Sequence, residues 1–404
     1  MKRKSMLALL LAVSMTCSMT AATGTVAFAS DDAATEEAAD DTEAAADDAD
    51  AADTEEASDD TTEASDDDQK AADEVGALID KIYVQERTDT TDEDCKAAKE
   101  AWDKLTDAQK ELVTGEEASP EYFGRDTGDA SKDDPRNQDE IGENELLVVS
   151  FGTSFNDSRA EDIKGIEDAL AKAYPDWSVR RAFTAQIIIN HVQARDDEVI
   201  DNMQQALDRA VANGVKNLVV QPTHLMNGLE YTDLVNELAE NSDAFEHVAV
   251  GEPLLTSDDD FKAVISAITD ATKEYDDGET AICFMGHGTE ADSNAVYQKM
   301  QDMLKEEGFD NYYVGTVEAT PSCEDVIAQV KEGSYKKVVL EPLMIVAGDH
   351  ANNDMAGDDD DSWKSQFKAA GYEVTCLVRG LGELEPIQQL FVQHAQAAID
   401  SLAK

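Results

Sequence analysis

Short apolar runs alternate with longer amphipathic segments from about Asn144 to Lys404. The apolar runs are four to six residues long, as in buried strands, and the segments between them have the spacing of helices. Strands separated by helices of this length indicate βαβ units and a largely parallel sheet. We predict strands at 146–150, 179–183, 218–221, 247–250, 281–285, 312–317, 337–340 and 373–378, and helices at 157–173, 198–213, 259–274, 295–307, 324–332, 361–370 and 386–402.

The two halves of this region repeat one another. The matching segments are Val148–Thr153 with Cys283–Thr289, and Val219–Gly228 with Val338–Gly348. The first match places Phe151 where the second half has His287, and the second places Glu230 where it has His350. We therefore predict an α/β fold of two similar doubly wound parallel-sheet halves, with a cleft between them into which Glu230, His287 and His350 point.

Charge is distributed unevenly along the chain. The net charge of the 404 residues is −57, and residues 31–68 are almost only Ala, Asp, Glu, Thr and Ser. Such a segment cannot bury enough apolar surface to offset its ordering entropy, so we predict a disordered acidic tether. Nucleic acid is excluded as a partner because phosphate binding requires a basic face.

The first residues have the pattern of a targeting signal. A basic start is followed by the apolar run Met6–Val13, which is too short to span a bilayer, and by the small-x-small sequence Ala27–Ala29. We predict cleavage before Ser30 and export, with the mature chain extracellular or at the cell surface; the alternative is an uncleaved anchor.

A small all-α module is predicted after the tether. Leu78, Ile79 and Ile82 recur at helical spacing, and Trp102 continues the apolar stripe. Ala77–Asp80 and the segment from 101 to 110 resemble helical modules repeated in secreted surface proteins of Gram-positive bacteria, which implies a spacer or adhesion unit. The predicted domains are the signal peptide at 1–29, the tether at 30–73, the module at 74–115, a polar linker at 116–143 and the main domain at 144–404, with halves at about 144–278 and 279–404.

Four cysteines follow the predicted cleavage site, and none are close enough in sequence to form a CxxC metal site. Export permits disulfides. Cys283 and Cys376, however, lie within apolar runs and are interpreted as small buried hydrophobic residues.

His287 is the first candidate for chemistry. It follows the predicted strand 281–285 and is flanked by Gly286 and Gly288. Open α/β folds hold ligands at the carboxyl ends of their strands, and glycines let a ligand approach the backbone. The alternative is a structural histidine that is bonded to the backbone.

His350 and Glu230 are the second and third candidates. His350 lies in a long polar loop after the strand 337–340, where Asp349 is expected to orient its imidazole. Glu230 is expected to open a helix after Gly228. The alternatives are a solvated acidic loop for His350 and a favourable acid in a first helical turn for Glu230.

The other histidines are interpreted differently. His224 lies near a strand end and is a weaker candidate for the cleft, whereas His191, His247 and His394 are interpreted as structural or surface residues. Two imidazoles and a carboxylate suit a divalent metal such as Co, Ni, Fe or Zn, and the same groups accept protons near neutral pH. Metal insertion into a tetrapyrrole requires both properties.

The main domain resembles the anaerobic sirohydrochlorin cobaltochelatases, a branch of the class II chelatases that serves cobalamin biosynthesis. The resemblance implies two α/β halves with the tetrapyrrole between them, Co²⁺ as substrate metal with Fe²⁺ or Ni²⁺ as open alternatives, no nucleotide, and His287, His350 and Glu230 as catalytic and metal-binding residues. The motifs that carry it are Ser150–Ser154, Gln221–His224, Met285–Thr289, Gly315–Glu318 and Ala347–Asp358.

Four residues after the first strand are candidates for holding the macrocycle. We expect Phe151 to pack on its face, and Ser150, Thr153 and Ser154 to donate hydrogen bonds to its carboxylates.

The export signal leads to an alternative function. An exported relative is expected to insert the metal into a scavenged tetrapyrrole, or to be an extracellular tetrapyrrole- or metal-binding protein that delivers its ligand to an uptake transporter without catalysis. A third alternative is a surface protein that keeps the fold only as a scaffold. The sequence leaves open whether the chain forms homo-oligomers.

Overall fold

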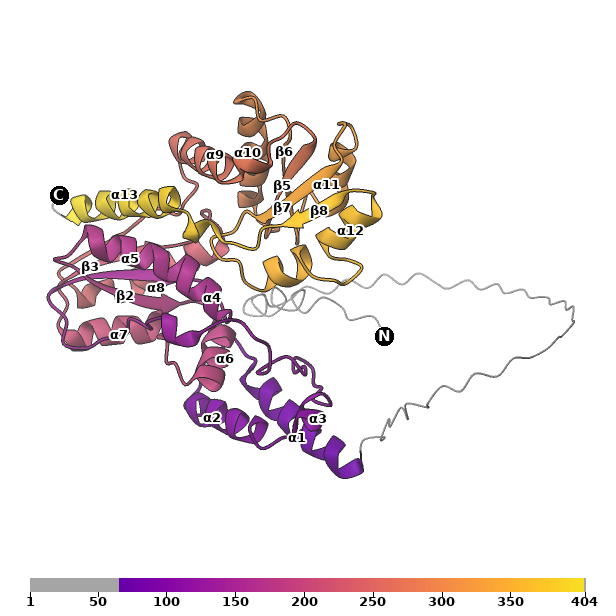
Figure 1. Cartoon of the computed structure of the whole chain (residues 1–404). Helices are drawn as coiled ribbons and strands as arrows, with labels where there is room; N and C mark the ends of the chain where they lie inside the picture. Colours follow the sequence, from indigo (N-terminus) through magenta and orange to yellow (C-terminus); the bar gives the residue numbers. More distant parts are fainter. Residues whose placement is uncertain (1–64, 403–404) are drawn as a thin grey trace, which may run out of the picture. The chain divides into compact units, whose positions relative to one another are not determined.

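The computed structural model describes residues 65–402, which form two four-stranded parallel sheets with helices around them (Figure 1). The first sheet has the order β2-β1-β3-β4 and the second the order β6-β5-β7-β8. The predicted fold class is confirmed. The strands are β1 Asn144–Ser150, β2 Ser178–Phe183, β3 Asn217–Pro222, β4 His247–Val250, β5 Thr280–Gly286, β6 Tyr312–Thr316, β7 Lys337–Pro342 and β8 Glu373–Cys376.

Both sheets are buried on both faces, which explains why their strands appear as continuous apolar runs rather than alternating ones. In β5, Ile282 and Phe284 belong to one apolar cluster, whereas Cys283 and Met285 belong to another. The equivalent strand β1 divides its side chains in the same way.

The registers of the two sheets bear out the internal repeat. Val149 of β1 lies opposite Pro222 of β3, and Met285 of β5 lies opposite Pro342 of β7. The sequence match aligns Val149 with Met285 and Pro222 with Pro342, so these two pairs are equivalent. The duplication therefore extends from strand order to the residue level.

The helices mostly follow the predicted pattern, with two differences in the first half. The bounds of helix α6 were not predicted, because its polar Gln186 and Asn190 are buried with its apolar residues and no amphipathic stripe results. The helix predicted from residue 198 begins at Met203, because Asn202 caps it in extended backbone. The helices of the main domain are α4 Asn156–Ser158, α5 Lys164–Ala173, α6 Gln186–Asp196, α7 Met203–Asn213, α8 Leu229–Asn241, α9 Asp258–Thr272, α10 Ala295–Glu306, α11 Cys323–Val330, α12 Trp363–Ala369 and α13 Glu385–Leu402.

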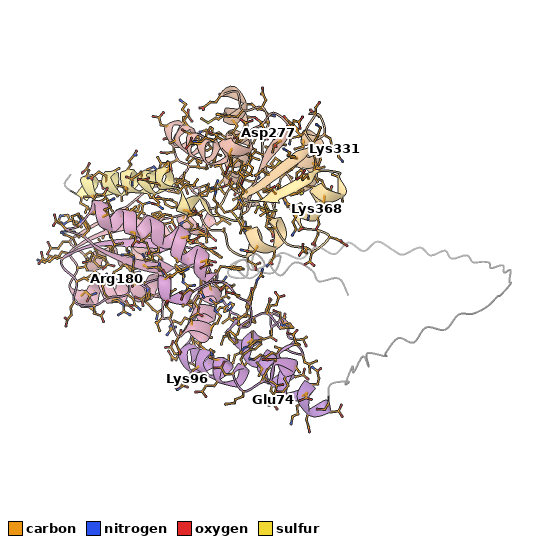
Figure 2. All side chains as sticks on the ribbon, viewed as in Figure 1. Glu74, Lys96, Arg180, Asp277, Lys331 and Lys368 are labelled. Carbon is orange, nitrogen blue, oxygen red and sulfur yellow. The ribbon has the colours of Figure 1, made fainter. Side chains whose placement is uncertain are left out.

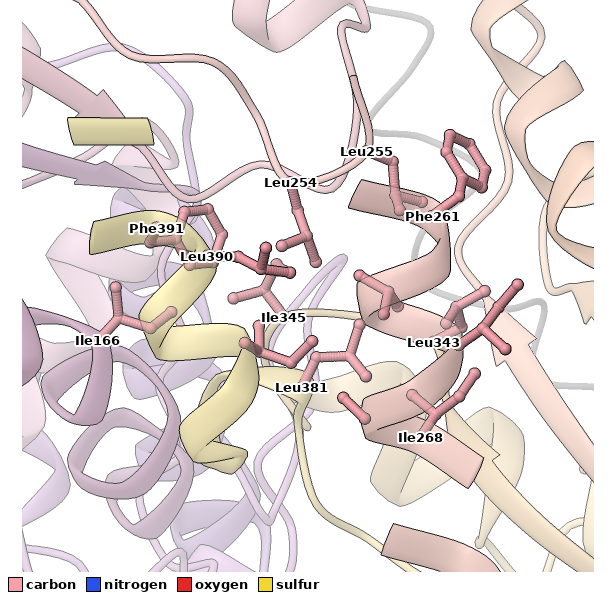
Figure 3. Packing of buried hydrophobic residues seen from close by; sticks show 14 of the residues in the cluster. Ile166, Leu254, Leu255, Phe261, Ile268, Leu343, Ile345, Leu381, Leu390 and Phe391 are labelled. Carbon is pink, nitrogen blue, oxygen red and sulfur yellow. The ribbon is translucent and has the colours of Figure 1, made fainter. Parts of the chain in front are cut away.

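One apolar cluster joins the two halves. Side chains from the first half, including Ile166 and Leu254, pack with Ile345 and Leu381 from the second (Figure 3). The last helix, α13, contributes Phe391 and packs against α5 as well as α9. The chain therefore returns to the first half at its end, although the sequence assigned residues up to 404 to the second.

The N-terminal helices are α1 Asp66–Ile82, α2 Thr91–Trp102 and α3 Asp107–Lys110. Helix α1 begins within the range that the sequence assigned to the tether. The apolar cluster of these helices extends to Tyr122 and Phe123, and it includes Ala194 of α6 in the main domain. We call residues 69–125 the N-terminal module. The predicted signal peptide and most of the tether lie outside the described residues.

The segment predicted as a linker at 116–143 is built into the fold. Asp133 is buried and accepts hydrogen bonds from Arg159 at 2.7 Å and Arg181 at 2.6 Å. The neighbouring Arg180, labelled in Figure 2, is also buried and lies 3.5 Å from a carboxylate oxygen of Glu145. The polar residues of this segment include members of buried ion pairs. The sequence pattern of such residues is the same as that of a solvated loop.

Cys95, Cys283, Cys323 and Cys376 are free thiols, and all but Cys376 are buried. Burial raises the pKa of the Cys95 thiol to about 12 and that of Cys283 well above its usual value, so both remain protonated. In the part of the chain that the structure describes, no helix combines the length and the apolar character that crossing a membrane requires.

Candidate active site

The structure brings His287 and His350 together. His287 follows β5 and His350 follows β7, and these strands are neighbours in the second sheet. The ring centroids are 4.7 Å apart and the ring planes meet at 89°. This place is the switch point of the sheet, where connections from adjacent strands lead to opposite sides and open α/β folds hold ligands.

Two glycines set the position of His287. Gly288 has φ +91°, which a side chain rarely adopts, and a Cβ on Gly286 would come within 2.1 Å of the Tyr297 ring. The Tyr297 hydroxyl accepts a hydrogen bond from the Gly288 amide at 3.2 Å. The strand end is therefore fixed by packing that only glycine permits.

The imidazole of His287 is held in one tautomer. Its Nδ1 lies 2.7 Å from the carbonyl oxygen of Gly288, which can only accept, so Nδ1 carries the proton and Nε2 keeps its lone pair. Desolvation, and next the charge of the nearby His350, lower the pKa of His287 below its usual value. His287 is therefore neutral at pH 7, as a metal-binding imidazole must be.

His350 is held in the same way by a carboxylate. Its Nδ1 lies 2.7 Å from Oδ2 of Asp354, and its buried Nε2 has no hydrogen-bond partner within residues 65–402. The expectation that Asp349 orients this ring is wrong. Asp349 accepts instead from Asn353 at 2.7 Å, because a single π-helical turn, Ala351–Met355, brings Asp354 under the ring.

Glu318 was missed as a candidate by the sequence analysis. Its amide donates to the carbonyl oxygen of His287 at 2.8 Å, and its charge raises the pKa of His287, against the larger effect of desolvation. In the first half Ala185 donates to Phe151 in the same way. The sequence signal that could have identified Glu318 is its position as the last residue of the motif Gly315–Glu318, directly after a strand.

Glu230 lies in the first half and is paired with His224. It stands in the first turn of α8, as predicted, and its Oε2 is 3.6 Å from Nε2 of His224. No hydrogen bond or ion pair within residues 65–402 joins Glu230 to His287 or His350. The repeat places Glu230 and His350 at equivalent positions, but the two side chains have different partners.

The Glu230–His224 pair is electrostatically unusual. Desolvation, and next the charge of Asp233, raise the pKa of Glu230 to about 7, although 52% of its side chain is accessible. Burial lowers the pKa of His224 to about 4, and both its ring nitrogens lack hydrogen-bond partners among the described residues. A carboxyl group that is partly ionised at neutral pH therefore lies beside a neutral imidazole, and the Glu230 carboxylate can accept a proton.

The four predicted macrocycle-holding residues have different environments. Phe151 is 40% exposed, which is unusual for a large apolar side chain. Ser150 is buried, with its hydroxyl 2.7 Å from that of Thr223, and the buried Thr153 hydroxyl accepts from the amide of Phe155. Ser154 is partly buried and its carbonyl accepts from Arg195 at 2.6 Å.

The segment that carries His350 is bonded to the first half. Asp162 accepts hydrogen bonds from the amides of Ala347 at 2.9 Å and Gly380 at 3.2 Å, and Ser158 donates to the Ala347 carbonyl oxygen at 2.7 Å. Asp162 is buried, and desolvation raises its pKa to about 7. The relative placement of the halves near the histidines thus depends on a buried carboxyl group.

The histidine pair places two imidazole rings side by side at the strand ends. Among the described residues, no group of three or more His, Cys, Asp or Glu side chains is arranged to hold a metal ion. Imidazole nitrogens suit a borderline divalent cation, and a metal held by only two protein ligands would keep positions open for others.

The two α/β halves and the paired histidines at a strand-end switch point define a metal chelatase. A family model described as cobalt chelatase (CbiK) matches residues 144–400, which is more than half of the chain. The chain belongs to the cobalt chelatase family.

Similar proteins align with nearly two thirds of the chain. The sirohydrochlorin cobaltochelatase of Salmonella typhimurium is 38% identical over 255 residues, which cover 63% of this chain and 96% of that protein. The sirohydrochlorin cobaltochelatase CbiKC of Nitratidesulfovibrio vulgaris is 29% identical over 259 residues, covering 64% and 91%. A solved structure, SirB from Bacillus subtilis with Fe³⁺, is 13% identical and has a TM-score of 0.47, covering 65% of this chain and 98% of SirB.

Proposed function

We propose that the chain inserts Co²⁺ into sirohydrochlorin and that it does so without a nucleotide. The observation that carries the proposal is the pair of imidazoles, His287 and His350, with ring centroids 4.7 Å apart in a domain of the cobalt chelatase family. The names of the relatives support the substrate, and the absence of a Gly-rich P-loop motif from the sequence supports the lack of a nucleotide.

The histidines receive the metal in this proposal. Each Nδ1 donates to a fixed oxygen, so each Nε2 presents its lone pair. Because His287 stays neutral to a lower pH than a free histidine, it does not need to lose a proton before Co²⁺ binds. Two ligands rather than a closed set allow the metal to leave for the macrocycle.

The first half accepts the protons. A tetrapyrrole loses two pyrrole protons when a divalent metal enters, and the half-exposed Glu230 carboxylate can accept them one after the other, releasing each to solvent. A pKa of about 7 lets the Glu230 carboxylate take a proton and release it again at neutral pH. The exposed ring of Phe151, which is equivalent to His287 in the repeat, offers an apolar face to the macrocycle.

Export is the second part of the proposal and rests on the first residues alone. The basic start, the apolar run and Ala27–Ala29 support secretion with cleavage before Ser30. Amino-terminal sequencing of the protein recovered from the culture medium or cell surface tests this. Detection of only the full-length chain inside cells would contradict it.

The test of the activity uses the purified protein, sirohydrochlorin and Co²⁺, and follows the absorption spectrum with time. We expect catalytic conversion with the protein well below the macrocycle concentration. Parallel reactions with Fe²⁺ and Ni²⁺ rank the metals, and addition of ATP is expected to change nothing. His287→Ala is expected to abolish insertion while the protein still unfolds cooperatively.

The alternative is a binding protein that carries a tetrapyrrole or metal to an uptake transporter, which the predicted export favours. In that case the macrocycle would bind in one-to-one ratio and remain without metal for the length of the assay. Equal activity of the His287→Ala protein would contradict both the proposed catalysis and the role of the histidine pair.

A further inference from the structure

Residues 1–143 lie before the region matched by the family model, and the Salmonella relative aligns over 96% of its own length with 63% of this chain. The N-terminal module is therefore an addition to the shared chelatase domain. The sequence suggested a spacer for it, but the structure places part of it against the segment that carries His350.

The module is packed firmly on helix α6. Tyr122 stacks on His191 with ring centroids 4.1 Å apart and planes 12° from parallel. Asn190 donates to the carbonyl oxygen of Ile82 at 2.9 Å, and the Cys95 thiol lies 3.6 Å from the Asn190 carbonyl oxygen. The module and helix α6 share one buried apolar cluster, so the module and the main domain have a continuous core at this contact.

Helix α6 places the module near the residues that are predicted to hold the macrocycle. The helix starts directly after Ala185, whose amide donates to the carbonyl oxygen of Phe151. At the end of the module, Arg125 lies over the Phe155 ring with its guanidinium carbon 5.2 Å from the centroid. Phe155 belongs to the same turn as the predicted macrocycle-holding residues.

Arg125 also reaches the second half. Its Nη1 donates to Oδ1 of Asn353 at 3.1 Å, and Nδ2 of Asn353 donates to Asp349 at 2.7 Å. Asn353 is followed by Asp354, the carboxylate that holds Nδ1 of His350. The charge of Arg125 also lowers the pKa of Asp349, against the larger effect of desolvation.

We propose that the N-terminal module is part of the catalytic unit, and that Arg125 is a positioning residue that holds the π-helical turn of His350 through Asn353. The inference rests on the proposed function for its catalytic consequence only. A hydrogen bond from a guanidinium to an amide oxygen is directional and charge-assisted, so it fixes the Asn353 side chain and hence the turn that carries Asp354.

A double-mutant cycle tests this route of action. Arg125→Ala and Asn353→Ala are each expected to lower kcat for insertion about 10- to 50-fold, as for groups that orient a metal ligand, with KM for the macrocycle changed less than about twofold. Because both act through one contact, the kcat of the double variant is expected to be no more than about twofold below that of the less active single variant. If the two effects multiply, the residues act independently of one another, which would overturn the proposal. A rise in KM alone would also overturn it, because it would show that Arg125 acts on substrate binding.

Matched variants separate positioning from folding. Arg87→Ala removes another module arginine, which pairs with Asp92 at 2.6 Å, and it is expected to leave kcat unchanged. Arg125→Lys keeps a charged donor and is expected to recover part of the loss. Equal losses in the Arg87→Ala and Arg125→Ala proteins would reduce the role of Arg125 to general stability and overturn the proposal.

A readout that needs no activity keeps this inference distinct from the proposed function. Amide hydrogen exchange in the peptide that spans 348–357 is expected to be faster in Arg125→Ala and Asn353→Ala than in the wild type and Arg87→Ala. Unchanged exchange would overturn the proposal even if insertion is observed. Faster exchange in a chain that inserts no metal would support the link to the turn and contradict only the proposed function.

Discussion

His287 and His350 stand edge to face at the ends of neighbouring parallel strands, with ring centroids 4.7 Å apart. Each ring donates its Nδ1 proton to an oxygen, a backbone carbonyl for His287 and the Asp354 carboxylate for His350. The two rings thus have the same tautomer and leave the same nitrogen free, although one is fixed by main chain and the other by a side chain.

The side-chain anchor of His350 can be removed selectively. We expect Asp354→Ala to lower the rate of insertion or the affinity for Co²⁺ about 10- to 100-fold, because the imidazole loses both its orientation and the charge that increases its basicity. Asp354→Asn keeps a neutral acceptor and should lose less. The control is Asp358→Ala, which removes an exposed carboxylate that pairs with Lys364 of α12. This variant should remain active. Wild-type Co²⁺ titration curves for Asp354→Ala would contradict this prediction.

Glu230 is expected to set the pH dependence of insertion. Its pKa of about 7 means that the carboxylate form is lost as the pH falls through 7, so the rate at pH 6 should be about tenfold below the plateau. The pKa of His287 is lowered, so protonation of that ring acts only at a more acidic pH.

Glu230→Gln separates these two effects. The amide accepts no proton at neutral pH, so the rate at pH 8 should fall at least about 100-fold and the step near pH 7 should disappear. The measurement is the initial rate of insertion from pH 5 to 9 for both proteins. An unchanged step in the variant would show that Glu230 is not the group that titrates.

Asp162 is expected to make stability depend on pH. Its carboxyl group has a pKa of about 7 in the folded chain and near 4 in the unfolded chain, so the folded state holds the proton more tightly. The free energy of unfolding should therefore fall as the pH rises from about 4 to 7, by at most about 4 kcal/mol for this group.

Urea unfolding of the wild type and Asp162→Asn at pH 5 and pH 8 tests this prediction. The variant cannot lose a proton, so it should lose less stability between the two pH values than the wild type. Asp157→Asn, an exposed acid in the preceding turn, is the control and should follow the wild type. Equal pH dependence of all three proteins would show that Asp162 is ionised in both states.

Gly286 is expected to tolerate no side chain. A Cβ there would come within 2.1 Å of the buried Tyr297 ring, whose hydroxyl anchors the Gly288 amide. Gly286→Ala should cost about 1–3 kcal/mol by overpacking and should also displace His287, so that Co²⁺ affinity falls with stability. Gly142→Ala, where nothing lies within 4 Å, is the matched control. Thermal unfolding and Co²⁺ titration of both variants measure the difference.

The internal repeat allowed much of the fold to be predicted from sequence. The apolar runs are strands because both sheet faces are buried, and the Gly-Thr and Pro matches predicted two equivalent halves, with which the registers of β1 with β3 and of β5 with β7 agree. His287 and His350 were both predicted to follow strands of the second half. The bounds of helix α6 escaped prediction because its buried Gln186 and Asn190 bind other buried groups and weaken the amphipathic signal.

The sequence by itself determined the alternation of strands and helices, the internal repeat and the positions of His287 and His350, because these depend on local periodicity and on matches between segments. Only the tertiary structure decided the partners of those side chains. It assigned Asp354 rather than Asp349 to His350, paired Glu230 with His224, and brought Arg125 to the turn of His350. Such contacts join residues that are distant in sequence or share one irregular helical turn, and each depends on packing that no periodic pattern encodes.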